Sequence, residues 1–303
     1  MLKITKSSDS IEVKNICVCI YGEPGVGKTS LGSTAKDPLL LDFDRGAHRS
    51  AFRKDIVQID AWEAVAGLTR DDLSGYGSLV IDTAGRLLDA LSAHLINENP
   101  KLAQGNGALS LRGYGELKSV YASWLSRVLQ YGVDVILLCH HKEDKRGDDM
   151  IVRPDIQGGS YGEVFKRSDG IAWMSMVRDR RMLSWSPTEM SAGKDAANLG
   201  KVVVPDFNQE PSYMAGVMQT IKDSLNRLSA EGKEVADKVA EWRDVVANME
   251  TAEQVNTELK GEAFAELKNP ALAQVKRLLA NRAKKLGFTY VGKHGEGKYE
   301  ATS

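Results

Sequence analysis

The chain is poor in cysteine, has no excess of either charge and has no long apolar run, and each absence excludes a class of protein. Its three cysteines, Cys17, Cys19 and Cys139, lie in apolar runs without a CxxC pair. They therefore predict buried, reduced thiols rather than disulfides. The 40 Lys and Arg residues balance 41 Asp and Glu residues, which excludes a wholly basic coating protein but allows a local basic groove. Because no run approaches the roughly 18 apolar residues of a membrane span, we expect a cytoplasmic protein without membrane contact.

The first 210 residues have the pattern of a mostly parallel β-sheet that helices cover on both faces. Short, continuously apolar runs alternate with polar helical stretches, as is typical of this α/β fold class. A charged turn at residues 178–181 separates two further strand-like runs and predicts a hairpin. The expected parallel strands are Ile16–Tyr21, Pro38–Phe43, Ile56–Ile59, Ser78–Ile81 and Val133–Cys139.

After Pro211 the pattern becomes helical, so we expect a boundary near residue 210 between an α/β domain (residues 1–210) and an all-α region (residues 211–303). Apolar stripes at residues 214–228 and 235–249 predict two separate helices. A capping box and a proline start with a glycine end predict two more, at Thr251 with Gln254 and at Pro270 with Gly287.

The last helix and the tail are rich in basic residues. Against only two acids, Glu296 and Glu300, this stretch carries Lys276, Arg277, Arg282, Lys284, Lys285, Lys293 and Lys298. Such a surface suits contact with phosphates. A solvated helix face explains the same pattern, and the sequence alone leaves both interpretations open.

The clearest motif is a phosphate-binding loop. Residues 22–29 read G-x-x-x-x-G-K-[ST] without a mismatch, between an apolar strand and a helical stretch. Glycines in such a loop let backbone N–H groups converge on phosphates, and the helix N-terminus adds its dipole. The motif predicts that Lys28 bridges the β- and γ-phosphates and that the Thr29 hydroxyl binds Mg²⁺. The expected nucleotide-binding residues are Gly22, Glu23, Pro24, Gly25, Val26, Gly27, Lys28, Thr29 and Ser30.

A second acidic residue completes the expected metal site. Asp82 ends the apolar strand at residues 78–81, where a carboxylate that supports Mg²⁺ is expected. The segment Asp82-Thr-Ala-Gly-Arg86 is similar to the DTAG-R of signal-recognition GTPases. Guanine recognition in those proteins needs a late [NT]-K-x-D segment, which this sequence lacks, so we expect ATP rather than GTP.

The catalytic base has no obvious place beside the metal aspartate. Thr83 stands where many P-loop ATPases carry a glutamate. The strand end Leu41-Asp-Phe-Asp44-Arg-Gly46 resembles the Ile-Asp-x-Glu strand end of RecA-type recombinases, whose last acid polarises the attacking water. The resemblance places Asp44 on that acid, one methylene shorter. A simple loop start is the alternative.

RecA-like cores also suggest roles for residues after the strand at 133–139. The polar residue at this strand end senses the γ-phosphate there, and His141 (or His140) matches its place. The following Lys142–Gln157 resembles a mobile DNA-contacting loop, which makes Lys145, Arg146 and Arg153 candidates for DNA binding. Beyond Gly158-Gly159, the resemblance makes Lys166 and Arg167 candidates for reaching a neighbouring subunit's ATP. Because acids interrupt the basic residues of the loop, a solvated surface loop remains an alternative.

Taken in order, these motifs over residues 12–206 resemble the Sak-type single-strand annealing ATPases of phages, which have a RecA/Rad-like P-loop core. They are GEPGVGKTS, LLLDFDRG, SLVIDTAG, LRGYGELKSVYASWL, LLCHHKED and the Gly-Gly segment. The resemblance implies a homo-oligomeric, Mg²⁺-dependent and DNA-stimulated ATPase that pairs single-stranded DNA in recombination, with help from a single-strand-binding protein in the host cytoplasm. The alternatives are an ATP-controlled adaptor that binds a protein through its C-terminal helices and a small-molecule kinase, although no Arg-rich lid supports the kinase.

Overall fold

The computed structural model describes residues 9, 11–50, 52–147, 149–292 and 297–301. Their contacts divide the chain into a large unit, Val13–Leu225, and a small unit that contains the described residues of 1–12 and 226–303. Within the described residues, no helix is both long and apolar enough to cross a membrane.

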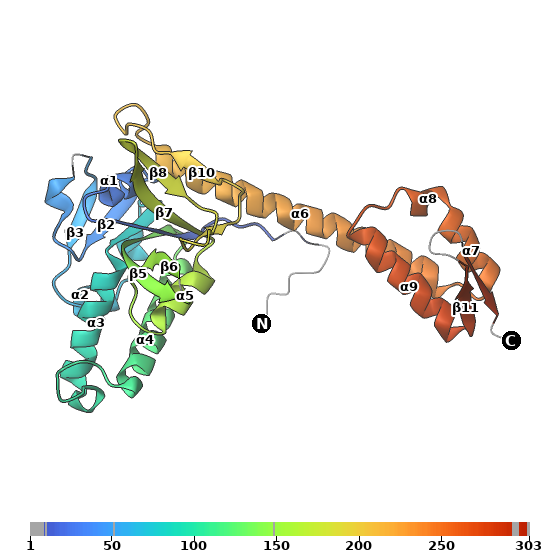
Figure 1. The fold of residues 1–303 in the computed structure, drawn as a ribbon, viewed down its shortest axis with the longest axis horizontal. Helices are drawn as coiled ribbons and strands as arrows, with labels where there is room; N and C mark the ends of the chain where they lie inside the picture. The colour runs from blue at the N-terminus through green and yellow to red at the C-terminus, as the bar shows by residue number, and fades with distance from the viewer. Residues whose placement is uncertain (1–8, 10, 51, 148, 293–296, 302–303) are drawn as a thin grey trace. The chain divides into compact units, whose positions relative to one another are not determined.

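A mostly parallel sheet forms the centre of the large unit (Figure 1). The parallel strands, in spatial order, are β7 (Gly170–Val177), β1 (Cys17–Gly22), β5 (Asp134–Arg146), β4 (Ser78–Asp82), β2 (Pro38–Asp42) and β3 (Asp55–Gln58). Antiparallel pairing adds β8 (Arg180–Ser184), β10 (Lys201–Val203) and the two-residue β9 (Lys194–Asp195) beyond β7. The fold class predicted from the sequence is confirmed, and the hairpin at residues 178–181 joins β7 to β8.

Alternating side chains of each central strand supply two separate hydrophobic cores. Cys17, Cys19 and Tyr21 of β1 point to one face, whereas Ile16, Val18 and Ile20 point to the other. This period of two is the geometry of a strand whose faces are both buried, and it explains why these runs are apolar throughout. All three cysteines are buried free thiols.

Helices cover both faces of the sheet. The first face packs against α3 (Ala84–Glu98) and α4 (Leu111–Leu129), which lie side by side (Figure 1), and against the short α2 (Glu63–Ala66) and α5 (Ser160–Arg167). Ser110 caps α4, and its side chain accepts a hydrogen bond from the Gly113 N–H. The second face packs against α1 (Lys28–Gly32) and the first turns of α6 (Tyr213–Ala247). The 3₁₀ turns are η1 (Ala47–Arg49), η2 (Asp71–Leu73) and η3 (Pro100–Leu102).

The segment expected as a mobile loop is a β-hairpin instead. β5 continues beyond Cys139 to Arg146 and pairs with β6 (Asp149–Pro154) in antiparallel register. Residues 142–146 are all charged, so a search for apolar runs misses this strand, and the side chains of 142–145 are exposed or half-buried. Tertiary pairing rather than local hydrophobicity therefore extends the strand.

A single helix replaces the two helices expected after Pro211. α6 runs without interruption over Tyr213–Ala247, and the division between the units falls inside it, after Leu225, rather than near residue 210. The reason is that Met214, Met218 and Ile221 are buried in the second core of the large unit. A change of secondary structure marks position 210, but packing decides the boundary.

The small unit has its own core of helices with a hairpin. It contains the end of α6, α7 (Ala252–Lys260), α8 (Glu262–Ala265), α9 (Ala271–Lys285) and the strands β11 (Phe288–Val291) and β12 (Lys298–Ala301). The capping box is present, since Thr251 accepts from the Gln254 N–H and Gln254 accepts from the Thr251 N–H. Trp242, Val255 and Val275 are among the residues of this core. The β-hairpin was not expected from the basic tail, and Lys293 lies outside the described residues.

Candidate active site

The ends of four neighbouring strands place the predicted site residues together. In register, Gly22 of β1 lies opposite His140 of β5, Leu138 of β5 opposite Asp82 of β4, and Asp82 opposite Asp42 of β2. Since parallel strands all end at the same edge of the sheet, the P-loop, Asp82 and the residues after β2 meet there. β5 lies between β1 and β4, so His140 comes between the P-loop and Asp82.

Glycines give the P-loop its shape. Gly25 and Gly27 have φ angles of 77° and 104°, which residues with a Cβ rarely adopt. A Cβ on Gly22 would lie 2.2 Å from the Met174 carbonyl oxygen of β7, so only glycine fits at the start of the turn. Gly27 then precedes α1, whose N-terminus faces the site.

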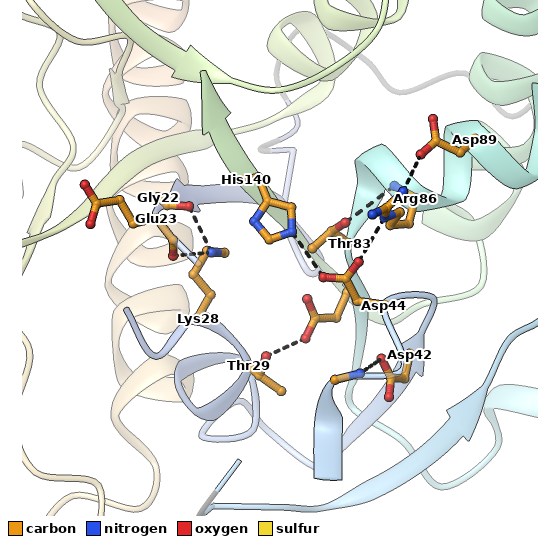
Figure 2. Close-up of polar contacts among 12 residues, drawn as sticks. Gly22, Glu23, Lys28, Thr29, Asp42, Asp44, Thr83, Arg86, Asp89 and His140 are labelled. Atoms are coloured by element: carbon orange, nitrogen blue, oxygen red, sulfur yellow. Dashed lines mark hydrogen bonds and ion pairs between the residues drawn. The ribbon is translucent and has the colours of Figure 1, made fainter. Parts of the chain in front are cut away.

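Lys28 is buried, with 6% of its surface exposed, and its ammonium is held by the loop itself. Nζ donates to the carbonyl oxygens of Gly22 at 2.9 Å and Glu23 at 2.8 Å (Figure 2). Burial lowers the pKa of Lys28, and the nearby carboxylates of Asp82, Asp44 and Glu23 oppose that shift. A phosphate would give this ammonium a partner of full opposite charge.

Thr29 and Asp82 form the candidate magnesium site. The Thr29 hydroxyl donates to Asp82 Oδ2 at 2.5 Å, and Asp82 is 4% exposed. Burial raises the pKa of Asp82, while the Thr29 hydrogen bond and the Lys28 charge oppose the shift. A buried carboxylate beside a hydroxyl is an all-oxygen donor set of the kind that Mg²⁺ prefers, so these two residues fit that ion. Among the described residues, no cluster of three or more His, Cys, Asp or Glu side chains suits another metal.

Asp44 lies across the site, held by two side chains from other strands and helices. Its Oδ2 lies 3.1 Å from His140 Nε2, and its Oδ1 accepts from Arg86 Nε at 3.2 Å (Figure 2). Arg86 is at the start of α3 and also donates to Asp89 Oδ2 at 3.3 Å. The hydrogen bond and charge of Asp44 raise the pKa of Arg86. The Asp44 carboxylate is therefore fixed in orientation at the strand end that the RecA resemblance indicated.

The P-loop, Asp82, Asp44 and His140 line one cavity of about 630 Å³, a size typical of small-molecule sites. The lining includes three residues that the sequence analysis did not single out: Arg49, Ser50 and Arg181. Arg181, in β8, donates from Nε to the Val26 carbonyl oxygen at 2.8 Å and so lies against the P-loop. The sequence showed Arg181 only as one of several charges in a turn, because the P-loop residue it contacts, Val26, is distant in sequence.

His140, rather than His141, faces this cavity. His140 lines it and contacts Asp44, whereas His141 lies one residue further along β5, opposite Pro154 of β6. Successive side chains of a strand point to opposite faces, so only one of two adjacent histidines can reach the nucleotide. The sequence could not choose between them without the register of β5.

Lys166 and Arg167 lie at the end of α5 and do not line the cavity of their own chain. The Lys166 side chain is 73% exposed and lies 3.7 Å from Glu163 Oε1. Arg167 is held more firmly, since Nη1 donates to Ser126 Oγ at 2.6 Å and Nε lies 3.6 Å from Glu163 Oε2. Of the two, Lys166 is the side chain with freedom to reach another molecule.

The DNA-binding candidates lie on the β5–β6 hairpin. Lys145 is on β5 opposite Met150 of β6. Arg153 contacts Asp144, and its guanidinium lies 4.7 Å from the ring centre of Tyr161. The side chain of Arg146 lies outside the part of the chain that the structure describes. The hairpin thus presents Lys145 more freely than Arg153.

Comparison with known proteins gives one family. The profile of the AAA_24 family, described as an AAA domain, matches residues 14–197, well over half of the chain. A search of curated proteins finds no match. Among solved structures, a KaiC-like protein from the hyperthermophilic archaeon Pyrococcus horikoshii is similar over 64% of this chain and 91% of its own, with 15% identity and a TM-score of 0.36.

Proposed function

The chain belongs to the AAA_24 family of AAA domains, and from this premise we propose that it hydrolyses MgATP and couples hydrolysis to binding and pairing of single-stranded DNA. The observation that carries the hydrolysis is the single cavity in which Lys28, Asp82, Asp44 and His140 meet. Lys28, Asp82 and Asp44 supply charges that phosphoryl transfer needs, and His140 lies within hydrogen-bonding distance of Asp44.

The phosphates of ATP are held by the P-loop. Its backbone N–H groups and the N-terminus of α1 bind the phosphate oxygens, and Lys28 neutralises charge on the β- and γ-phosphates. Thr29 and Asp82 are the residues that would hold Mg²⁺, which neutralises charge on the phosphates when bound.

Asp44 orients the attacking water. A carboxylate that accepts a hydrogen bond from the water directs its oxygen at the γ-phosphorus, and this positioning is the main work of catalysis in phosphoryl transfer. His140 and Arg86 hold the carboxylate in that orientation. Because His140 lies on β5 and lines the cavity, loss of the γ-phosphate would change the contacts of a residue of β5.

The two adjacent histidines allow a matched test of this arrangement. Asp44→Asn should spare ATP binding and lower turnover by about 10²-fold or more, the range of general-base effects. His140→Gln should lower turnover in the same direction, whereas His141→Gln should leave it unchanged, because His141 does not line the cavity. Turnover and ATP affinity are measured for all three. If the His140 and His141 variants turn over ATP equally fast, or if Asp44→Asn leaves the rate unchanged, Asp44 and His140 do not take part in catalysis.

Single-stranded DNA is the proposed partner because of the strand that the two sites share. β5 carries His140 at the cavity and then continues into the hairpin with Lys145. A hairpin whose first strand carries His140 at the cavity would connect the nucleotide directly to DNA. We assign the protein to recombination, as an annealing or strand-pairing ATPase that a single-strand-binding protein assists.

A homo-oligomer would complete the site. Lys166 is exposed and outside its own cavity, so it suits a neighbour's nucleotide better than its own. Arg167 is the second candidate, although Ser126 and Glu163 already bind it. Partial activity on mixing Lys166→Ala with Lys28→Ala subunits supports a shared site, and no activity at any ratio contradicts it.

One observation favours an alternative, an ATP-controlled adaptor with little turnover. The hairpin cations have acidic partners: Arg153 contacts Asp144, and Lys142 Nζ lies 3.6 Å from Asp155 Oδ1. These pairs weaken the attraction of the hairpin for a polyanion. The adaptor would bind ATP and a protein, and DNA would change neither event.

A further inference from the structure

The exposed face of α9 in the small unit differs in charge from the rest of the protein. The helix carries five basic residues and no acidic one, in a chain whose net charge is only −1. Lys276, Arg277, Lys284 and Lys285 are exposed, whereas Val275, Leu279 and Ala283 of the same helix are buried in the core. The apolar face thus fixes the orientation of the helix and leaves its cationic face to solvent.

The four exposed cations have no counterion among the described residues of their own unit. None of them forms an ion pair or a hydrogen bond with a side chain in the described ranges of the chain. Elsewhere in the unit, in contrast, Arg227 lies 3.9 Å from Glu231 and Lys238 lies 2.7 Å from Glu234. The fifth basic residue, Arg282, has a structural role, because its guanidinium donates twice to the Met249 carbonyl oxygen.

Spacing along the helix suits a chain of phosphates. Arg277 and Lys284 are seven residues apart and therefore lie on one side of the helix, about 10 Å from each other. Lys276 and Lys285 flank them, and Gln274 and Asn281 add exposed hydrogen-bond donors. Lysine, arginine and amide side chains are the groups that most often contact the backbone of nucleic acids.

From these observations we propose that the exposed face of α9 binds the phosphodiester backbone of DNA. This deepens the proposed function, on which it rests, by placing a second contact with the DNA in the small unit. A membrane surface does not fit, because the residues between the cations are Ala, Gln and Asn, and an interfacial helix needs an apolar face to insert. The leucine and valine side chains of α9 lie against the core instead.

The test compares two double variants that remove equal charge from the same unit. Arg277→Gln with Lys284→Gln removes two unpaired cations of α9, and Arg227→Gln with Lys238→Gln removes two ion-paired cations of α6. Glutamine is a good helix former, so circular dichroism should show both variants folded. Binding of a labelled oligonucleotide is measured for the full chain, single-stranded and as a duplex, between 0.05 and ~0.5 M salt.

We expect the α9 variant to lose two phosphate contacts. For single strands, the slope of log K against log[salt] should become shallower by about 1.4. If the contacts contribute little at about 1 M salt, this slope corresponds to binding about 25-fold weaker than that of the wild type at ~0.1 M salt. The α6 variant should bind like the wild type. A stronger effect on single-stranded than on duplex DNA identifies the single strand as the source of the phosphates, and the reverse identifies the duplex.

Two results would overturn the inference in distinguishable ways. If the wild type binds DNA and the two double variants bind alike, α9 is not the site, while the proposed function stands. If the wild type binds no DNA but binds vesicles that contain phosphatidylserine, or binds neither, both the α9 site and the DNA part of the proposed function fail. ATP turnover measured without DNA then decides whether the hydrolysis survives.

Discussion

Asp82 carries its charge where water barely reaches it, and this has consequences for stability as well as for catalysis. Burial raises its pKa above the ordinary value of 3.8. Folding therefore favours the protonated form of this group. Its contribution to stability is complete below about pH 4 and is lost as the pH rises through the raised pKa. Burial therefore opposes the charged form of Asp82 in the nucleotide-free protein.

Asp82→Asn should stabilise the nucleotide-free protein at pH 7 while it abolishes ATP hydrolysis. Asparagine keeps an oxygen to accept from Thr29 but carries no charge to desolvate. A gain of ~1 kcal/mol would raise Tm by about 2–4 °C in a unit of this size. The gap from the wild type should close below about pH 4, where Asp82 is protonated. Thermal scans with and without MgATP, beside an Asp60→Asn control at an exposed carboxylate, measure this. A lower Tm for Asp82→Asn at pH 7 would contradict it.

Arg181 is the residue at this scale that only the structure reveals. It lines the cavity, and its Nε is held by the Val26 carbonyl oxygen, which leaves the two terminal nitrogens of the guanidinium directed to other partners. No described residue accepts a hydrogen bond from those nitrogens. A phosphate oxygen of the nucleotide would satisfy them.

Arg181→Gln should weaken ATP binding by about 10- to 100-fold, the range that hydrogen bonds to charged groups give. Arg180→Gln removes the same charge from the adjacent residue, which does not line the cavity, and should bind ATP like the wild type. Titration with a fluorescent ATP analogue measures both. Similar affinities for the two variants would show that Arg181 only supports the P-loop backbone.

At the scale of elements, the sequence predicts what is local and misses what pairing decides. The five parallel strands and the P-loop turn were predictable because apolar runs and glycines are signals within a few residues. The β5–β6 hairpin was not, because residues 142–146 are all charged and become a strand only through pairing with β6. The sequence analysis placed His141 (or His140) at the γ-phosphate, and the structure shows that it is His140 that lines the cavity. The sequence could not decide between them for the same reason, because the register that orients them is a property of two strands.

The apolar stripe that begins α6 shows the same limit, because its members differ in burial. Met218 is 1% exposed in the second core, whereas Leu228, two to three turns later, is 52% exposed. Helical spacing treats both as core residues. Only the packing against the sheet, which ends within α6, separates them.

Met218→Ala should therefore lower the free energy of unfolding by about 2–5 kcal/mol, the usual cost of a cavity in a core. Leu228→Ala, an equivalent truncation on the same helix, should change it by less than about 0.5 kcal/mol because its side chain is already solvated. Urea unfolding followed by circular dichroism gives both values. Equal losses for the two variants would mean that the stripe is buried along its whole length.

For the whole molecule, the proposed function combines a nucleotide site in the large unit with proposed DNA contacts on the β5–β6 hairpin and on α9. The overall charge gives no hint of this, because 41 acids conceal the local excess of cations on α9. Family membership supports the P-loop ATPase core, and the proposed role of DNA rests on β5, which joins the cavity to the hairpin, and on the cations of α9.

The most direct test of the central claim is ATP turnover with and without single-stranded DNA, at low and at high salt. Lys28→Ala is the control, because it removes the ammonium that the P-loop places at the phosphates. We predict that DNA raises the turnover of the wild type, that high salt abolishes the increase, and that Lys28→Ala shows no turnover in either condition. A wild-type protein that binds ATP but turns it over at a rate that DNA does not change would contradict the claim and identify the adaptor function instead.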